Sequence, residues 1–156
     1  YERAQEELSR FGAFATGVFT RHKTDGGRIN QDAYEAVWEH VTGRRLIHPE
    51  QRYARPVFMQ PEHFNWIPLQ GHTGVSRKLL GVFSERGTKI ALYRVEGGAA
   101  LRMDGNAIYF VNAGAGTVDG IRYSAHATIF VEMGESATTI AESESELLQL
   151  GLPCLD

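Results

Sequence analysis

The sequence predicts a mainly β protein, in which a pair of helices precedes a β-sandwich or β-barrel. Before about residue 55, apolar residues recur at spacings of three and four, which is the period of one helix face. After Arg55 they alternate with polar residues in short runs, which is the period of a strand. Such runs recur at a spacing of about ten residues without alternating helices, so we expect antiparallel sheets. We therefore expect a helical lead-in at 1–55 and a β domain at 56–156.

The lead-in is expected to form two helices joined by a turn at 23–28, where Gly26 and Gly27 can adopt positive φ. Asn30 is the expected N-cap of the second helix, and Gly43 is expected to end it. Each helix has an apolar stripe. The stripe residues are Leu8, Phe11, Ala15, Val18 and Phe19 in the first helix, and Tyr34, Val37, Trp38 and Val41 in the second.

The β domain is expected to contain strands rich in β-branched and aromatic residues, separated by glycine-rich or charged turns. The glycine-rich segment 114–120 is interpreted as one of these turns. The expected strands are 77–83, 89–95, 107–112, 128–132, 137–141 and 146–150.

Composition excludes several classes of function. Apolar residues make up 42% of the chain and charged residues 22%, which is typical of a globular protein with a sizeable core. The net charge of −3 does not favour nucleic acid or an anionic membrane as a partner. The single cysteine, Cys154, permits no internal disulfide, so a cytoplasmic location is expected. Tyr1 is not a start methionine, so the question of an upstream segment stays open.

The segment 90–120 has a recognisable order of strands and glycines. One strand ends at Gly97-Gly98, a later strand contains 108–111, and the glycine-rich stretch 114–120 follows. This order resembles the first conserved motif of the cupin family, and Gly134-Glu135 resembles the Gly-Asp turn of its second half. The resemblance covers about residues 75–153 and implies a cupin-type β-barrel, or jelly roll. It also implies a homodimer, which would cover exposed strand edges.

The chain departs from this family at the usual metal ligands. Metal-binding cupins place two histidines one residue apart on a strand, so that both imidazoles point to the same side, followed by a glutamate and a later histidine. Here residues 102–106 contain no histidine, the glutamate position falls near Ala107, and the Pro-x-Gly-x-x-His signature is absent. We therefore expect no metal and no other cofactor, which leaves the family's metal chemistry in doubt for this chain.

Polar and aromatic residues in or beside the expected strands are the candidate site residues. His126, Tyr109 and Arg94 are the candidate catalytic groups, because an imidazole, a phenol and a guanidinium can move or stabilise protons and charge. A buried arginine would in addition need an anionic partner. The candidate ligand-binding residues are Arg102, Glu85, Tyr123, Trp66 and His72.

Three functions stay open on this evidence. The first is a metal-free cupin that binds a small organic molecule in its barrel and acts as an isomerase, dehydratase or cyclase. The second is a non-catalytic dimerisation or regulatory module, such as one half of a two-cupin protein. The third is a metal-dependent dioxygenase with atypical ligands, for which His63, His72 and His126 are the candidates. A fold alone does not decide between them.

Overall fold

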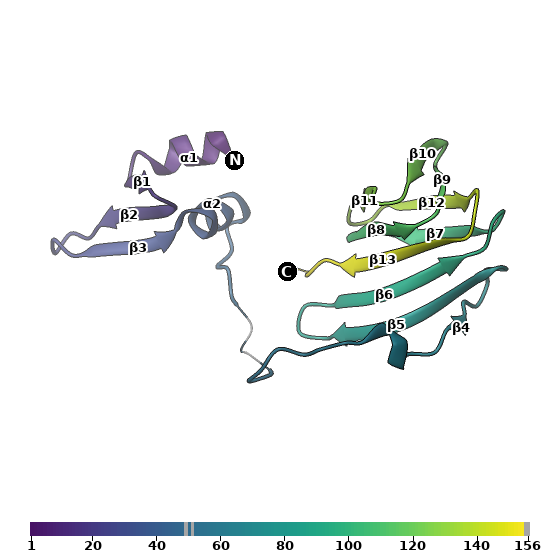
Figure 1. The fold of residues 1–156 in the computed structure, drawn as a ribbon. Helices are drawn as coiled ribbons and strands as arrows, with labels where there is room; N and C mark the ends of the chain where they lie inside the picture. The colour runs from purple at the N-terminus through teal and green to yellow at the C-terminus, as the bar shows by residue number, and fades with distance from the viewer. Residues whose placement is uncertain (49, 51, 155–156) are drawn as a thin grey trace. The chain divides into compact units, whose positions relative to one another are not determined.

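The computed structural model describes residues 1–48, 50 and 52–154 of the chain. It divides the chain into two compact units, Tyr1–Glu50 and Gln51–Asp156 (Figure 1). The first unit is a small α/β unit and the second is entirely β apart from one short 3-10 helix. We describe each unit by itself.

The first unit contains two helices and a three-stranded antiparallel sheet with strand order β1-β2-β3, and α2 packs against both α1 and the sheet. The expected helix at 8–19 is therefore wrong beyond Leu8. Thr16 and Gly17 both adopt positive φ, which turns the chain into a β1–β2 hairpin, and Phe19 packs on Phe14 with ring centroids 4.6 Å apart. The elements are α1 (Glu2–Leu8), β1 (Ala13–Ala15), β2 (Val18–His22), β3 (Arg28–Asp32) and α2 (Ala33–Thr42).

The start of helix α2 also differs from the expectation. Asp32 is the N-cap, because its carboxylate accepts hydrogen bonds from the backbone N–H groups of Tyr34 and Glu35. Asn30 lies in strand β3, where its side chain accepts a hydrogen bond from Thr20. The end of the helix is as expected, since Gly43 adopts the left-handed conformation there, with φ 65°.

The second unit contains two antiparallel sheets that form a barrel (Figure 1). The four-stranded sheet has the order β10-β9-β12-β7, and the six-stranded sheet has the order β11-β8-β13-β6-β5-β4. The elements are η1 (Pro61–His63), β4 (Ile67–Pro68), β5 (Val75–Phe83), β6 (Thr88–Val95), β7 (Ala100–Asp104), β8 (Ala107–Ala113), β9 (Ala115–Val118), β10 (Ile121–Ser124), β11 (Thr128–Val131), β12 (Ser136–Ala141) and β13 (Ser145–Gly151).

All six strands expected in the β domain are present, with small differences at their ends. The interpretation of 114–120 as a turn is wrong, because this segment contains β9. Gly116 lies inside that strand as a packing residue, since a Cβ there would clash with the carbonyl oxygen of Ile140. Gly114 and Gly120 flank the strand with positive φ.

The core of this unit lies inside the barrel, between the two sheets. Alternate residues of each strand point inward, as the period of two requires. Three polar residues, Thr139, Ser145 and Gln149, are also buried, and their side chains have hydrogen-bond partners. The apolar core residues are Val75, Ala91, Tyr93, Val95, Leu101, Met103, Ala107, Tyr109, Val111, Val131, Ala141 and Leu147.

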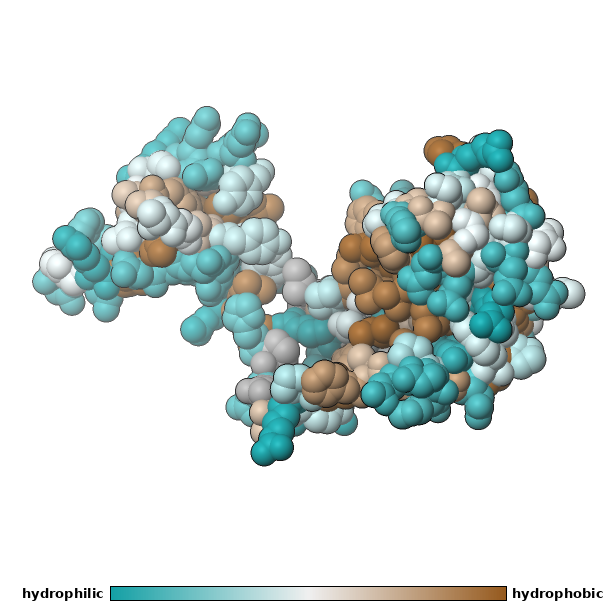
Figure 2. Space-filling model, in the orientation of Figure 1, coloured by the Kyte–Doolittle hydropathy of each residue, from teal (hydrophilic) through white to brown (hydrophobic). Residues whose placement is uncertain are grey.

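The outer face of the six-stranded sheet is also apolar over strands β11, β8, β13 and β6. The register places one apolar residue of each strand beside the next, so that they form a continuous row. Two of them are well exposed, Phe130 at 57% and Leu150 at 38%. Hydrophobic surface is visible on one side of this unit in Figure 2. The row consists of Phe130, Ile108, Leu150 and Ile90, and Phe110, Leu148 and Leu92 form a second row beside it.

Candidate functional site

A cavity of about 420 Å³ lies where the edge strands of the two sheets, β10 and β11, face each other. Only a short connection, residues 125–127, joins these two strands. The cavity is lined mainly by apolar residues that also pack against the barrel core, which gives it the character of a ligand pocket at a barrel mouth. These residues are Val118, Tyr123, Ala127, Ile129, Val131 and Ala137.

Tyr123 brings a hydroxyl group to this lining. Its hydroxyl lies 2.9 Å from Oγ1 of Thr139, which is fully buried on β12. Gly116 on the intervening strand β9 makes this contact possible, because a Cβ at that position would fall 2.7 Å from the Tyr123 hydroxyl. Each of the two hydroxyl groups can donate and accept hydrogen bonds, so the pair can serve a ligand carbonyl or hydroxyl group.

The rim of the cavity is polar, and two of its charged side chains form internal contacts. Arg122 donates a hydrogen bond to the carboxylate of Glu142 at 2.8 Å, and both side chains are exposed. The Asp119 carboxylate accepts a hydrogen bond from the backbone N–H of Thr138 at 3.1 Å. These contacts hold the strand ends that frame the opening.

A chain of hydrogen bonds crosses the barrel interior beside this cavity. The Tyr93 hydroxyl donates to Oε1 of Gln149 at 3.1 Å, and Nε2 of Gln149 donates to the Tyr109 hydroxyl at 2.9 Å. Tyr109 in turn donates to the carbonyl oxygen of Asp104 at 3.1 Å. Burial raises the pKa of Tyr109 well above its ordinary value, so this phenol stays protonated at neutral pH. Tyr109, a candidate catalytic residue, is thus a buried hydrogen-bonding residue of the core, 1% exposed.

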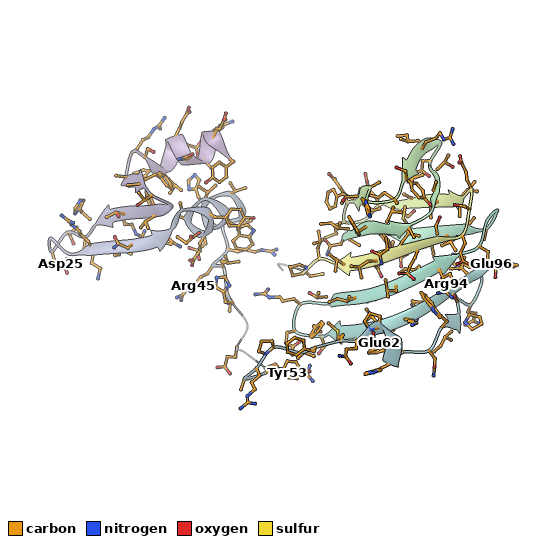
Figure 3. The ribbon with its side chains drawn as sticks, in the orientation of Figure 1. Asp25, Arg45, Tyr53, Glu62, Arg94 and Glu96 are labelled. Atoms are coloured by element: carbon orange, nitrogen blue, oxygen red, sulfur yellow. The ribbon has the colours of Figure 1, made fainter. Side chains whose placement is uncertain are left out.

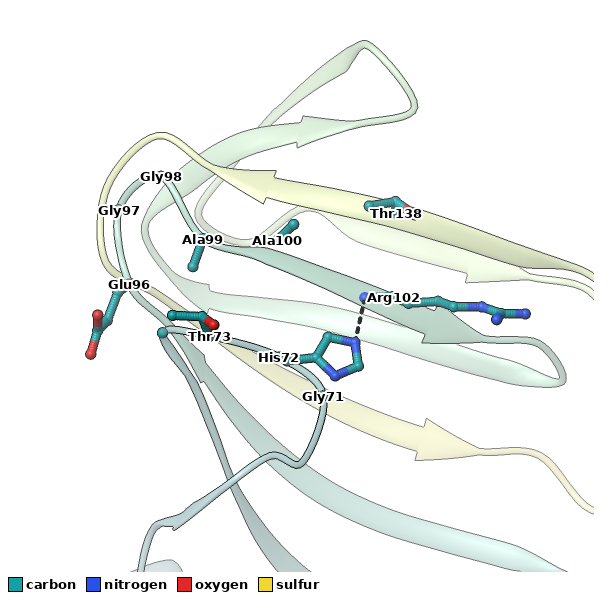
Figure 4. A pocket seen from close by; sticks show the side chains of 11 residues that line it. Gly71, His72, Thr73, Glu96, Gly97, Gly98, Ala99, Ala100, Arg102 and Thr138 are labelled. Atoms are coloured by element: carbon teal, nitrogen blue, oxygen red, sulfur yellow. Dashed lines mark hydrogen bonds between the residues drawn. The ribbon is translucent and has the colours of Figure 1, made fainter.

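The structure gathers four of the other candidates around the loop at 69–74, outside the barrel. Figure 4 shows Nε2 of His72 accepting a hydrogen bond from the backbone N–H of Arg102 at 3.4 Å, beside a groove of about 590 Å³. The guanidinium of Arg94 lies over the ring of Trp66, 4.3 Å from its centroid. Arg94 and Arg102 alternate with inward-facing neighbours, so both side chains point away from the barrel interior.

The remaining two candidates lie elsewhere. Glu85, in the turn between β5 and β6, forms an ion pair with Arg52 at 3.0 Å. His126 lies beside a strand, in the connection between β10 and β11, with φ 70°. Its exposed ring stacks on Phe110 at a centroid distance of 6.1 Å, on the outer face of the six-stranded sheet.

The three histidines considered as atypical metal ligands do not form a metal site among the described residues. His63 lies in η1, His72 in the loop before β5, and His126 in the β10–β11 connection. Across residues 1–48, 50 and 52–154, no group of three or more His, Cys, Asp or Glu side chains is arranged to hold a metal ion. Three positions that face the barrel interior hold Leu101, Met103 and Ala137. These side chains carry neither the imidazole nor the carboxylate groups that the metal site of a cupin uses. None of the described helices has the length and apolarity needed to cross a bilayer.

Several solved structures share this fold. The chain is 18% identical to an acetylacetone dioxygenase from Acinetobacter johnsonii (TM-score 0.56, covering 70% of this chain and 80% of that one). It is 14% identical to an RmlC-like cupin protein from Ralstonia eutropha JMP134 (TM-score 0.56, 64% and 69%). It is 12% identical to the polyketide cyclase RemF from Streptomyces resistomycificus (TM-score 0.52, 64% and 80%). No protein-family model and no curated protein sequence matches the chain.

These similarities show the fold of the second unit, which is a cupin-like β-barrel, as the order of strands and glycines in the sequence predicts. Sequence identities of this size establish the fold, and the function has to be argued from the site.

Tyr123 is among the candidates expected from the sequence, but the two residues that position it, Gly116 and Thr139, are not. The inward-facing alternation Ala137, Thr139, Ala141 was present in the sequence as a signal. The contact between Tyr123 and Thr139, however, depends on how β10 pairs with β9 and how β9 pairs with β12. The second of these pairings joins segments that are distant in sequence.

Proposed function

We propose that the cupin barrel binds a small, largely apolar organic molecule in the cavity between β10 and β11. The pairing of the Tyr123 and Thr139 hydroxyls at the edge of an apolar cavity is the observation that carries this proposal. An apolar lining favours a hydrocarbon or aromatic body, and one hydroxyl pair fixes its orientation through a single carbonyl or hydroxyl group.

Acid–base chemistry without a metal is the reaction class that these residues support. The Tyr123 hydroxyl can donate a hydrogen bond to a ligand carbonyl that displaces its bond to Thr139, and so polarise that carbonyl. Isomerisation, dehydration and cyclisation all use such a step. Among the proteins with the same fold, one is named a polyketide cyclase, which supports the cyclase as one form of this proposal.

A second candidate function is a non-catalytic dimerisation or regulatory module. The first apolar row on the outer face of the six-stranded sheet favours it, because Phe130 and Leu150 are exposed there and exposed apolar surface is typical of sites that another molecule covers. Among the described residues, no buried side-chain nitrogen or oxygen lacks a hydrogen-bond partner, which gives the barrel interior the character of a packed core. A cupin of this second kind would dimerise without binding small molecules at Tyr123.

Thermal denaturation in the presence of a small-molecule library tests the first function. We expect compounds with one carbonyl or hydroxyl group on a ring system to raise the melting temperature. At a ligand concentration of 100 Kd, binding should increase the free energy of unfolding by about 2.7 kcal/mol. Ala137→Phe fills the cavity and should abolish the effect, whereas Tyr34→Phe, on exposed helix α2, should leave it intact. Stabilisation that survives Ala137→Phe would place the ligand elsewhere and contradict the proposal.

Elemental analysis of protein purified without chelators separates these functions from a metal enzyme. The proposal expects far less than one transition metal ion per chain. About one iron, manganese, nickel, copper or zinc ion per chain would overturn it, because a resident metal would then supply the chemistry.

A further inference from the structure

The first unit carries a groove with a chemistry different from that of the barrel cavity. It has a volume of about 540 Å³ and lies between strand β3 and the C-terminal end of helix α2. Three arginines line it: Arg21 on β2, and Arg44 and Arg45 directly after the helix. Figure 3 shows Arg45 just beyond the end of α2.

The guanidinium groups of these three arginines are free of internal partners. In the part of the chain that the structure describes, they take part in no ion pair and donate no side-chain hydrogen bond. Arg3, Arg52 and Arg122, by contrast, each hold a carboxylate. The donors of the groove therefore remain available to a ligand.

Glu39 lines the same groove but does not neutralise the arginines through contact. Its Oε2 accepts a hydrogen bond from Gln31 at 2.8 Å, and its Oε1 accepts one from the backbone N–H of Leu46 at 2.8 Å. These two hydrogen bonds lower the pKa of Glu39, and the charges of Arg45 and Arg21 lower it further. Glu39 therefore stays ionised and serves as an anchor for the backbone after the helix.

This anchor fixes the positions of Arg44 and Arg45. The left-handed Gly43 ends the helix on one side of the pair, and the bond from Leu46 to Glu39 holds the chain on the other. Arginines near a helix C-terminus are also favoured by its partial negative charge, which accounts for these two positions in the absence of a ligand. That effect does not account for Arg21, which reaches the groove from a strand, opposite Ile29 in the β2–β3 register.

We propose that this groove binds a phosphorylated small molecule. Guanidinium groups present paired N–H donors that match the oxygens of a phosphate, and strand β2 together with the segment after α2 brings three arginines to this one groove. Ile29 offers an apolar contact and Glu35 a hydrogen-bond acceptor for the organic part of the ligand. Three arginines against Glu35 and Glu39 leave the groove with a formal charge of 3 − 2 = +1. This site is independent of the barrel cavity and of its proposed function.

Titration calorimetry on the full chain at low salt tests the proposal, with glucose 6-phosphate and adenosine 5′-monophosphate as organic probes and inorganic phosphate as the reference. We expect at least one organic phosphate to bind more tightly than inorganic phosphate. Binding should weaken as the salt concentration rises, because exposed charges are screened. Arg44→Gln combined with Arg45→Gln should weaken binding at least about tenfold, and Arg21→Gln should weaken it by a similar factor.

The matched control is Arg10→Gln combined with Arg28→Gln, which removes the same charge from exposed positions of the same unit that do not line the groove. This control should change the affinity by less than about twofold. Circular dichroism should show all variants folded. Equal losses in the groove and control variants, tighter binding of inorganic phosphate than of either organic phosphate, or no binding of any probe would each overturn the proposal.

Discussion

The Tyr123 hydroxyl reaches across strand β9 to the buried hydroxyl of Thr139 on β12, 2.9 Å away. In the β10–β9 register Tyr123 stands opposite Gly116, whose missing side chain leaves room for the phenol. An edge strand is thereby tied to a central strand of the same sheet at the mouth of the barrel. Both the stability of this end of the barrel and the polarity of the cavity depend on this arrangement.

Gly116→Ala is expected to destabilise the barrel strongly. The added Cβ would clash with the carbonyl oxygen of Ile140 and displace the Tyr123 hydroxyl, so we expect a loss of about 2–4 kcal/mol in the free energy of unfolding. Denaturation in urea measures it. The control is Gly98→Ala, where the new Cβ meets open space and only the positive φ of 84° opposes it, at a cost of about 1 kcal/mol. A smaller loss for Gly116→Ala than for Gly98→Ala would contradict this role for Gly116.

Tyr123 and Thr139 are expected to be energetically coupled. Tyr123→Phe leaves the buried Thr139 hydroxyl without its partner and should cost about 1–3 kcal/mol of stability. Thr139→Val should cost a similar amount, and the double variant less than the sum of the two, as a double-mutant cycle will show. Tyr123→Phe should also weaken ligand binding about tenfold. Additive losses would mean that the two hydroxyls do not interact in solution.

The buried tyrosines predict a loss of stability at high pH. Burial raises the pKa of Tyr109 from its ordinary value of 10.0, and that of Tyr93 likewise. Above about pH 10 the unfolded chain releases these protons while the folded chain retains them, so proton release favours unfolding. The contribution of these two groups to the free energy of unfolding should therefore stay constant below about pH 9. Above about pH 10 the free energy of unfolding should fall.

Tyr109→Phe tests this assignment, because it removes one of the two titrating groups. The fall above pH 10 should become less steep in this variant, whereas Tyr34→Phe, an exposed tyrosine on α2, should leave its slope unchanged. An identical pH profile for wild type and Tyr109→Phe would show that Tyr109 does not titrate differently on folding.

The homodimer expected from the sequence remains a prediction, and the apolar outer face of the six-stranded sheet is the surface we expect it to use. Phe130→Asp places a charge in the exposed row and should shift the mass measured by light scattering from that of a dimer towards that of a monomer. Val41→Asp, equally exposed but on α2, serves as the control. A monomeric mass of the wild-type chain at high concentration would count against the dimer.

The sequence predicted the barrel better than the first unit, for a physical reason. Strands such as β8 and β13 alternate between buried and less buried residues over most of their length, so their period identifies them without reference to partners. Over residues 8–19, helix-like spacings coexist with Gly12 and Gly17, and the hairpin forms because Thr16 and Gly17 supply a tight turn. Strand β9 escaped prediction because its glycines, which are typical of a turn, here permit close packing.

Of the eight candidate site residues, Tyr123 alone lines the barrel-mouth cavity. Arg94 and Arg102 are candidates because they lie in or beside expected strands, but the direction in which a strand side chain points depends on register, which one sequence does not specify. The gathering of His72, Trp66 and these arginines around the loop at 69–74 is likewise a tertiary effect.

A titration followed by two-dimensional amide NMR tests the central claim most directly. An organic ligand identified by thermal denaturation is added to the labelled chain, and the shifted amides are assigned. The account predicts that the shifts concentrate on β9, β10, β11 and β12, with Tyr123 and Thr139 among the most affected residues. Shifts confined to the outer face of the six-stranded sheet or to the loop at 69–74 would contradict ligand binding in the barrel mouth.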